Sequence, residues 1–173
     1  MPLCLKNEKL DQIVLDKFGY TDVPETELAE WNKFLQRYKF PKKEITIGLI
    51  GKYIELKDAY ISIYESFIHA GAQNECKVNV ERIHAEEINK NNLKEKLGNL
   101  DGIFVAPGFG QRGIDGKIYA IQYARENNIP FFGICLGMQM AVIEFARNVL
   151  KLEDANSAEM KQNCKNPVDR IGP

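Results

Sequence analysis

One stretch of the sequence combines residue types and spacing that are typical of a nucleophile. Residues 131–139 read FFGICLGMQ and join an apolar run typical of a strand to a helix expected over 136–149, with Cys135 at the corner. A residue on such a tight turn has a strained backbone, and the flanking Gly133 and Gly137 leave it space. This is the nucleophile-elbow arrangement with cysteine in place of serine. The pattern predicts that Cys135 is a nucleophile.

The expected helix also supplies a reason for reactivity. Its N-terminal amides and the positive end of its dipole point at the thiol, which favours the thiolate that attacks a carbonyl carbon. The alternative is a structural cysteine in the core, because free cysteine is among the most buried residue types. The glycine-flanked position of Cys135 favours the nucleophile.

A glycine-rich segment, Gly108–Gly113 (GFGQRG), follows the third expected strand. Its spacing matches a dinucleotide-binding fingerprint, but that fingerprint expects an acidic residue at the end of the next strand, where Cys135 stands instead. We favour a loop whose glycines let a backbone amide approach a substrate oxyanion. The segment Gly48–Tyr53 is no phosphate-binding loop because its glycines are too close together, and Lys52 is interpreted as a solvated charge or a partner contact.

The remaining candidate residues carry weaker signals. His69 and His84 are isolated, and a lone histidine is more often structural than catalytic, so neither is favoured as the base for Cys135. Glu144 and Arg147 are expected to pair on the surface of the helix after the corner. The four cysteines form neither a CxxC pair nor a cluster with metal-ligand spacing, which predicts no metal site and a reduced, cytoplasmic setting.

Strands alternate with helices from Lys43 onward, the pattern of a mostly parallel α/β sheet with helices on both faces. The expected strands cover residues 45–51, 78–83, 102–106 and 129–135, and the expected helices 58–70, 86–97, 115–127 and 136–149. Ile61 is expected to face the core, and Gly71 to end its helix. Because the carboxyl ends of parallel strands share one edge, the loops after residues 51, 106 and 134 should meet there.

The first forty residues have a different pattern. Two short helices are expected, one over 10–18 with Gly19 as its stop and one from Thr26 to Tyr38. Two such helices cannot make a core, so this segment is interpreted as the tail of another domain plus a connector. Its apolar face should need a partner.

The composition excludes two classes of partner. The chain has 173 residues, 45% of them hydrophobic and 27% charged, and its net charge of −1 provides no basic surface for nucleic acid. No apolar run approaches the roughly 18 residues of a membrane span. Residues 1–10 lack the apolar core of a secretory signal. We therefore predict neither a nucleic-acid nor a membrane partner.

The stretch Gly133–Gln139 resembles the elbow of class I (triad) glutamine amidotransferases. The segments 108–117, 124–130 and 141–148, with GKY at 51–53 and KDAY at 57–60, resemble the CTP synthase family in particular. This resemblance covers residues 2 to about 168 and implies a flavodoxin-like fold. It further implies that residues 1–18 end a synthetase domain, 19–43 form a linker, and 44–173 belong to a glutaminase domain that is incomplete at its C-terminus.

By that resemblance, the substrate is L-glutamine and Cys135 forms a glutamyl thioester with it. The family's substrate-binding positions match Gly108, Leu136, Gly137, Met138, Gln139 and Glu159, and its GTP-response positions match Arg112 and Gly113. The backbone amides of Gly108 and Leu136 would hold the oxyanion. Gln139 and Glu159 would bind the amino-acid end of glutamine.

The family makes CTP from UTP with ATP, magnesium and glutamine, responds to GTP and forms homo-tetramers. ATP, magnesium and UTP are expected in the synthetase domain, so no cofactor is expected in this chain. The histidine that acts as the family's catalytic base, and the glutamate two residues after it, have no counterpart before Pro173. Residues 169–173 also depart from the family pattern. The chain alone is therefore expected to be weakly active or inactive, and to expose a strand edge that promotes association.

Two other interpretations stay open. The chain could be another α/β hydrolase with a cysteine elbow, DJ-1-like or protease-like, that uses a nearby acidic residue or a different histidine. It could also be a non-catalytic assembly module in which residues 1–40 are the docking element.

Overall fold

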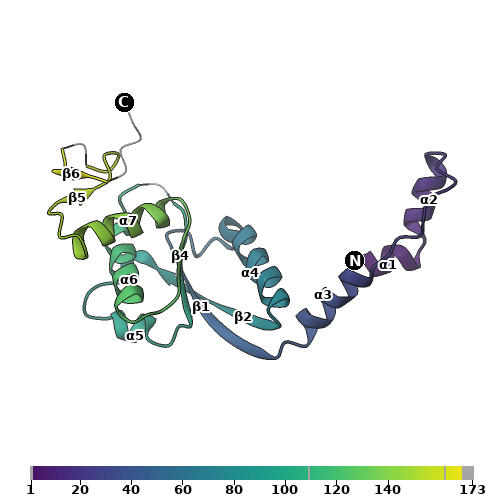
Figure 1. Ribbon diagram of the computed structural model, residues 1–173, viewed down its shortest axis with the longest axis horizontal. Helices are drawn as coiled ribbons and strands as arrows, with labels where there is room; N and C mark the ends of the chain where they lie inside the picture. Colours follow the sequence, from purple (N-terminus) through teal and green to yellow (C-terminus); the bar gives the residue numbers. More distant parts are fainter. Residues whose placement is uncertain (1, 109, 162, 169–173) are drawn as a thin grey trace.

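Four strands form one parallel sheet in the middle of the protein, as the computed structural model in Figure 1 shows. They are β1 (Lys43–Gly51), β2 (Cys76–His84), β3 (Gly102–Val105) and β4 (Phe131–Gly133), in the spatial order β2-β1-β3-β4. All three pairings are parallel. The order begins as flavodoxin-like sheets do, which confirms the predicted fold class. The structure describes residues 2–108, 110–161 and 163–168; the divergent tail 169–173 lies outside them.

Helices cover both faces of this sheet. The short 3-10 helix η1 (Lys57–Tyr60) and α4 (Ile61–Gln73) lie on one face, and η2 (Ala85–Glu87), α5 (Leu93–Leu97), α6 (Ile114–Glu126) and α7 (Leu136–Asn148) on the other (Figure 1). Successive strand residues point to opposite faces. Leu49 and Phe104 therefore pack towards Tyr60, whereas Ile50 and Val105 pack into the larger core.

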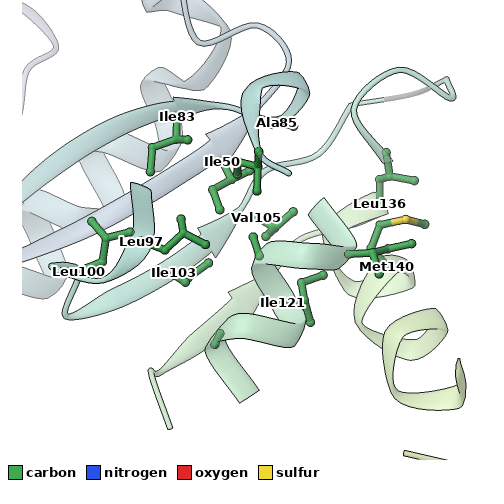
Figure 2. Packing of buried hydrophobic residues seen from close by; sticks show 14 of the residues in the cluster. Ile50, Ile83, Ala85, Leu97, Leu100, Ile103, Val105, Ile121, Leu136 and Met140 are labelled. Carbon is green, nitrogen blue, oxygen red and sulfur yellow. The ribbon is translucent and has the colours of Figure 1, made fainter. Parts of the chain in front are cut away.

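The larger core lies between the sheet and the helices α6 and α7. Figure 2 shows Ile121 from α6 and Met140 from α7 facing Val105 of the sheet. These side chains are at most 4% exposed. Because strands buried on both faces read as continuous apolar runs, the sequence pattern locates them well.

The expected helix over 86–97 is wrong as a continuous element. The structure has η2 and α5, separated by a polar turn at residues 88–92. In this turn the side chain of Asn92 accepts a hydrogen bond from the backbone of Asn89 at 2.9 Å and donates one to the carbonyl of Glu87 at 2.8 Å. Asparagine side chains compete with helical hydrogen bonds in this way.

Two further expectations about the helix after β1 are wrong. Ile61 is 59% exposed, and Ile63 takes the core position instead, because a 3-10 turn precedes α4 and shifts the helical phase. Gly71 does not end the helix but lies inside it. A Cβ at Gly71 would lie 2.5 Å from the backbone oxygen of Cys76, so this glycine allows α4 to approach the start of β2.

The N-terminal helices α1 (Pro2–Asn7), α2 (Leu10–Lys17) and α3 (Ala29–Lys39) lead away from the sheet (Figure 1). The stop at Gly19, with φ 76°, agrees with the sequence, whereas the later helix begins at Ala29 and not at Thr26. The helix α3 contacts the sheet domain: the ring of Phe34 packs edge-on against His69 at 5.6 Å between centroids. Large apolar side chains of the outer helices are exposed, including Ile13 (51%) and Phe18 (75%).

Two short paired strands, β5 (Ala155–Asn156) and β6 (Asn166–Pro167), follow α7. The Nε of Arg147 in α7 donates to the carbonyl of Ala155 at 2.6 Å and so joins this parallel two-stranded unit to the helix. Across residues 2–108, 110–161 and 163–168, no helix has the length and apolarity to span a bilayer.

Candidate active site

The corner between β4 and α7 has the strained geometry that the sequence predicts. Cys135 has φ 52° and ψ −112°, outside the regions that L-residues favour. A Cβ at Gly133 would lie 2.5 Å from the backbone carbon of Gly137, and a Cβ at Gly137 would lie 2.2 Å from the carbonyl oxygen of Val105. Only glycine fits at either position, because the obstructing atoms are backbone. The two glycines therefore bring β3, β4 and α7 together around Cys135.

The thiol of Cys135 is accessible and stands at the start of a thirteen-residue helix. The carbonyl of Cys135 accepts the first helical hydrogen bond, from the amide of Gln139 at 3.1 Å. No acidic side chain occupies the first turn of α7, so none offsets the positive end of the helix dipole there. The exposure of Cys135 excludes the alternative of a cysteine buried in the core.

The glycine-rich loop between β3 and α6 requires glycine at three positions. Gly108, Gly110 and Gly113 have φ values of 149°, 89° and 75°, conformations that side chains with a Cβ rarely adopt. A Cβ at Gly113 would also lie 2.9 Å from the Cβ of Ala85. The spacing that matches a dinucleotide fingerprint thus arises from the turn itself.

Lys52, which follows β1, anchors this loop through a hydrogen bond. Its Nζ donates to the carbonyl of Gly110 at 2.6 Å, and the residue is only 5% exposed. The expectation of a solvated charge or partner contact is therefore wrong. The pKa of Lys52 is lowered, mainly by burial and secondly by the positive charge of Arg112.

Lys117 in α6 is a second buried lysine at this site, and sequence reasoning missed it. The residue is fully buried, and its Nζ donates to the carbonyl of Ala106 at 2.9 Å. Burial lowers the pKa of Lys117 to about 8. The burial of Lys117 could have been predicted from the sequence, because this residue falls on the apolar stripe formed at helical spacing by Ile114, Ile118 and Ile121.

The two positions linked by resemblance to GTP lie on the outer side of the loop. Arg112 is exposed, and its Nε lies 3.0 Å from a carboxylate oxygen of Glu86. Gly113 caps α6. Both line a cleft of about 230 Å³ between the loop and η2.

The predicted glutamine-binding residues do not all gather at the thiol. Leu136 belongs to the core, Gly137 packs on β3, and Gln139 is half-buried in the first turn of α7. Met138 instead lines an apolar cleft of about 410 Å³ along the outer face of α7. Glu159 is exposed in the turn after β5.

That turn is joined to the glycine-rich loop. The side-chain amide of Gln111 donates to the carbonyl of Met160 at 3.2 Å, and the amide of Glu159 bonds to the hydroxyl of Ser157 at 3.2 Å. Glu159 is therefore placed beside the loop by contacts that the sequence alone does not indicate.

Neither histidine is placed to act as base for Cys135. His69 is on α4, against Phe34. His84 ends β2 and its Nε2 lies 2.9 Å from a carboxylate oxygen of Glu55. Because β2 and β4 are separated by β1 and β3, His84 lies roughly 14 Å across the sheet from the end of β4, at about 4.8 Å per strand.

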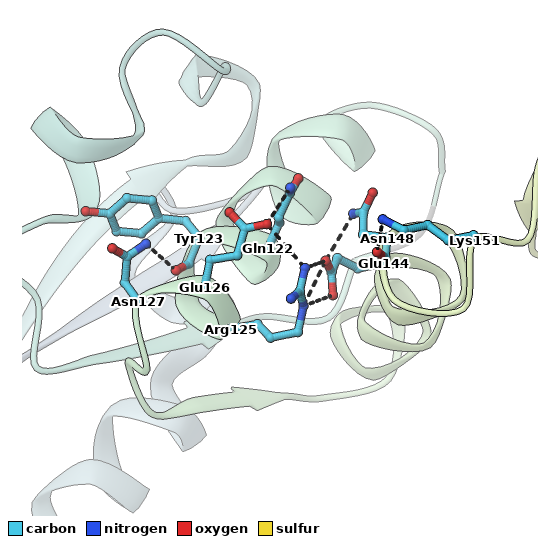
Figure 3. A network of polar contacts seen from close by, with 8 residues as sticks. All are labelled: Gln122, Tyr123, Arg125, Glu126, Asn127, Glu144, Asn148 and Lys151. Carbon is cyan, nitrogen blue, oxygen red and sulfur yellow. Dashed lines mark hydrogen bonds and ion pairs between the residues drawn. The ribbon is translucent and has the colours of Figure 1, made fainter.

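A polar network ties α6 to α7 (Figure 3). Glu144 is 1% exposed and accepts hydrogen bonds from Arg125 at 2.8 to 3.2 Å and from the side chain of Asn148 at 3.0 Å. Hydrogen bonding to Glu144 raises the pKa of Arg125. The expected surface pair of Glu144 with Arg147 is wrong, because Glu144 is buried against Arg125 of α6 and Arg147 donates to the carbonyl of Ala155. The described residues contain no group of three or more His, Cys, Asp or Glu arranged for a metal ion.

Comparison with known proteins decides the family. The model of the family described as "Glutamine amidotransferase class-I" matches residues 55–170. The chain belongs to this family. The matched residues include the glycine-rich loop, the buried Lys117 of α6 and the corner at Cys135.

Within the glutamine amidotransferases, the similar proteins are CTP synthases. The CTP synthase of Christiangramia forsetii is 60% identical over 168 residues, which are 97% of this chain and 31% of that protein. That of Carboxydothermus hydrogenoformans is 55% identical over 173 residues, 32% of its length. A solved structure, the glutaminase domain of Trypanosoma brucei CTPS with bound acivicin, matches with a TM-score of 0.66 and 40% identity. This match covers 70% of the chain and 48% of that structure.

Proposed function

We propose that this chain is the part of a CTP synthase that carries the nucleophile for glutamine hydrolysis. The observation that carries the proposal is the geometry of Cys135: it is accessible, its backbone is strained, and it lies between two positions where only glycine fits. The chain that holds it belongs to the glutamine amidotransferase family. The high identity to CTP synthases supports the narrower assignment.

In the proposed reaction the Cys135 thiolate attacks the carboxamide carbon of L-glutamine. A C–S bond forms, the carbonyl becomes an oxyanion, and collapse of this intermediate breaks the C–N bond. The nitrogen leaves as ammonia after gaining a proton, and the glutamyl thioester remains. Water then attacks the thioester and releases glutamate.

Backbone amides are the proposed stabilisers of the oxyanion. The amide of Leu136 is the one after the nucleophile, the position that serves this purpose at a nucleophile elbow. Gly108 lies at the carboxyl end of β3, beside β4, and its φ of 149° is a conformation that glycine permits. Donors that are already oriented need no rearrangement as charge develops, which is the main source of their effect.

The reaction also needs a residue that delivers a proton to the leaving ammonia, and neither described histidine lies near Cys135. Both histidines are placed elsewhere, so we propose that the residue that protonates ammonia is neither of them. This supports the expectation that the chain alone hydrolyses glutamine weakly.

The remaining assignments are proposals from similarity. Gln139 and Glu159 are proposed to bind the amino-acid end of glutamine, and the cleft beside Arg112 and Gly113 to mediate the response to GTP. The whole protein would use the ammonia to amidate UTP, with ATP and magnesium bound by its synthetase portion and with a homo-tetrameric assembly.

An electrophilic chloroketone analogue of glutamine tests the proposal. We expect it to alkylate Cys135, with protection by free L-glutamine, and to spare the half-buried Cys164, as peptide mass spectrometry would show. A Cys135→Ser variant is the control that should lose the label. Labelling of Cys135 by iodoacetamide but never by the chloroketone would refute a glutamine site.

A second experiment separates the proposal from an assembly module. In the full-length protein, Cys135→Ala should abolish CTP formation from glutamine and retain CTP formation from added ammonia. Unchanged glutamine-dependent activity would favour a non-catalytic role for this part of the chain.

A further inference from the structure

Lys117 is a buried cation beside the nucleophile. This α6 residue is fully buried, and its Nζ donates a hydrogen bond to the carbonyl of Ala106 at 2.9 Å. Among the described residues no carboxylate forms an ion pair with it. A buried ammonium without a carboxylate costs free energy, so such a group suggests another source of negative charge.

The sheet register places the Ala106 carbonyl, to which Lys117 donates, next to the turn at Cys135. Val105 is paired with Gly133, and the amide of Ile134 donates to the carbonyl of Val105 at 3.2 Å. Ala106 directly follows Val105, Cys135 lies two residues beyond Gly133, and adjacent strands lie about 4.8 Å apart. The carbonyl that binds Lys117 and the corner that carries the thiol are therefore neighbours. The deprotonated thiol of Cys135 in turn raises the pKa of Lys117.

We propose that Lys117 is a positioning residue: its ammonium anchors the start of the glycine-rich loop at Ala106 and serves as the fixed counter-ion of the Cys135 thiolate. The inference rests on the proposed role of Cys135 as nucleophile and adds the source of its counter-charge. The helix N-terminus and the lysine would then both stabilise the thiolate.

The other charges around Lys117 are consistent with this role. Lys52 faces it from the end of β1 and repels it, while Lys52 itself is held by the Gly110 carbonyl and lies near Arg112. Glu86 on η2 is the acidic residue that acts on Lys52, and it also pairs with Arg112. The loop is thus surrounded by an excess of positive charge, which favours an anion at the thiol.

Alkylation of Cys135 by iodoacetamide at pH 7 tests the pair, with peptide mass spectrometry to separate the four cysteines. Lys117→Met keeps the side-chain length and removes the charge, and we expect it to slow alkylation of Cys135 about tenfold, the lower end of the effect of a nearby opposite charge. Lys117→Arg should restore most of the rate. Lys94→Met, an exposed lysine in α5, is the matched control and should leave the rate unchanged.

A reciprocal measurement does not require a substitution of the buried lysine. Titration of the Lys117 side chain by carbon-detected NMR should show its midpoint at lower pH in Cys135→Ser than in the wild-type chain, because the thiolate no longer stabilises the ammonium. This titration tests the ion pair even if circular dichroism shows that Lys117→Met is unfolded.

Either a wild-type alkylation rate in folded Lys117→Met or an unchanged Lys117 midpoint in Cys135→Ser overturns the inference. Neither result affects the glutamine proposal, which fails separately if the chloroketone does not label wild-type Cys135. The two failures are therefore distinguishable in one set of samples.

Discussion

Substitution of Gly137 by alanine should misplace the nucleophile. The added Cβ would lie 2.2 Å from the carbonyl oxygen of Val105, against about 3.4 Å for ordinary contact. The helix α7 must therefore move by about 1 Å away from β3, because the obstructing atom is backbone and cannot rotate aside. Overpacking of this kind typically costs about 1–3 kcal/mol. The higher helix propensity of alanine offsets less than about 1 kcal/mol of that.

The structure offers a matched control in the same sheet. A Cβ at Gly102 in β3 would lie 3.7 Å from Ile47 and from the carbonyl of Pro130, which is ordinary contact. We expect Gly102→Ala to leave the unfolding free energy within about 0.5 kcal/mol of wild type. Gly137→Ala should lower it by about 1–3 kcal/mol in urea unfolding followed by circular dichroism.

The same variant should affect reactivity more than stability. A displacement of about 1 Å at a reacting group can cost about a hundredfold in rate. We therefore expect labelling of Cys135 by the chloroketone to fall by one to two orders of magnitude in Gly137→Ala, measured under conditions where the variant is folded. Equal stability and equal labelling in the two alanine variants would refute the argument that glycine at 137 sets the position of the sulfur.

Three further predictions concern the buried polar groups. Arg125→Met should destabilise the chain by about 3–5 kcal/mol in urea unfolding because it leaves Glu144 buried without its cation, and adding Glu144→Met should recover most of the loss. Burial lowers the pKa of Lys117 from 10.5 to about 8, so the unfolded chain holds the extra proton between these values and stability should rise with pH there. The rise amounts to about 3 kcal/mol at 1.36 kcal/mol per pKa unit and should be absent in Lys117→Met; a rise of equal size in that variant would contradict it. Tyr60→Phe removes a hydroxyl that donates to the Pro107 carbonyl at 3.4 Å, and at that length its loss should cost about 0.5–1.5 kcal/mol, measured by thermal unfolding.

Much of the fold and the corner could be predicted from local pattern. The strands are buried on both faces, so their apolar runs are continuous, and the glycines around Cys135 are required by a local turn whose stereochemistry is general. Such features depend on residues close in sequence.

The expectations for Lys52 and Glu144 fail because of contacts that join distant segments. Lys52 reads as an exposed charge until the Gly110 carbonyl, which folds over it, is known. Glu144 could only be assigned to the interior once Arg125 on the neighbouring helix was seen to neutralise it. The phase of α4 differs from the expected one for a local reason: the preceding 3-10 turn has a different number of residues per turn.

The two lysine contacts to the glycine-rich loop have a consequence for folding kinetics. The sulfur environment is assembled from Lys52, the loop at 106–110, Lys117 and the corner at Cys135, and the contact from Lys52 to Gly110 spans 58 residues. Contacts of such sequence separation form late, after the cost of loop closure has been met. A partly folded chain therefore carries an ordinary thiol, and the rate at which Cys135 gains its reactivity during refolding should report completion of the whole sheet.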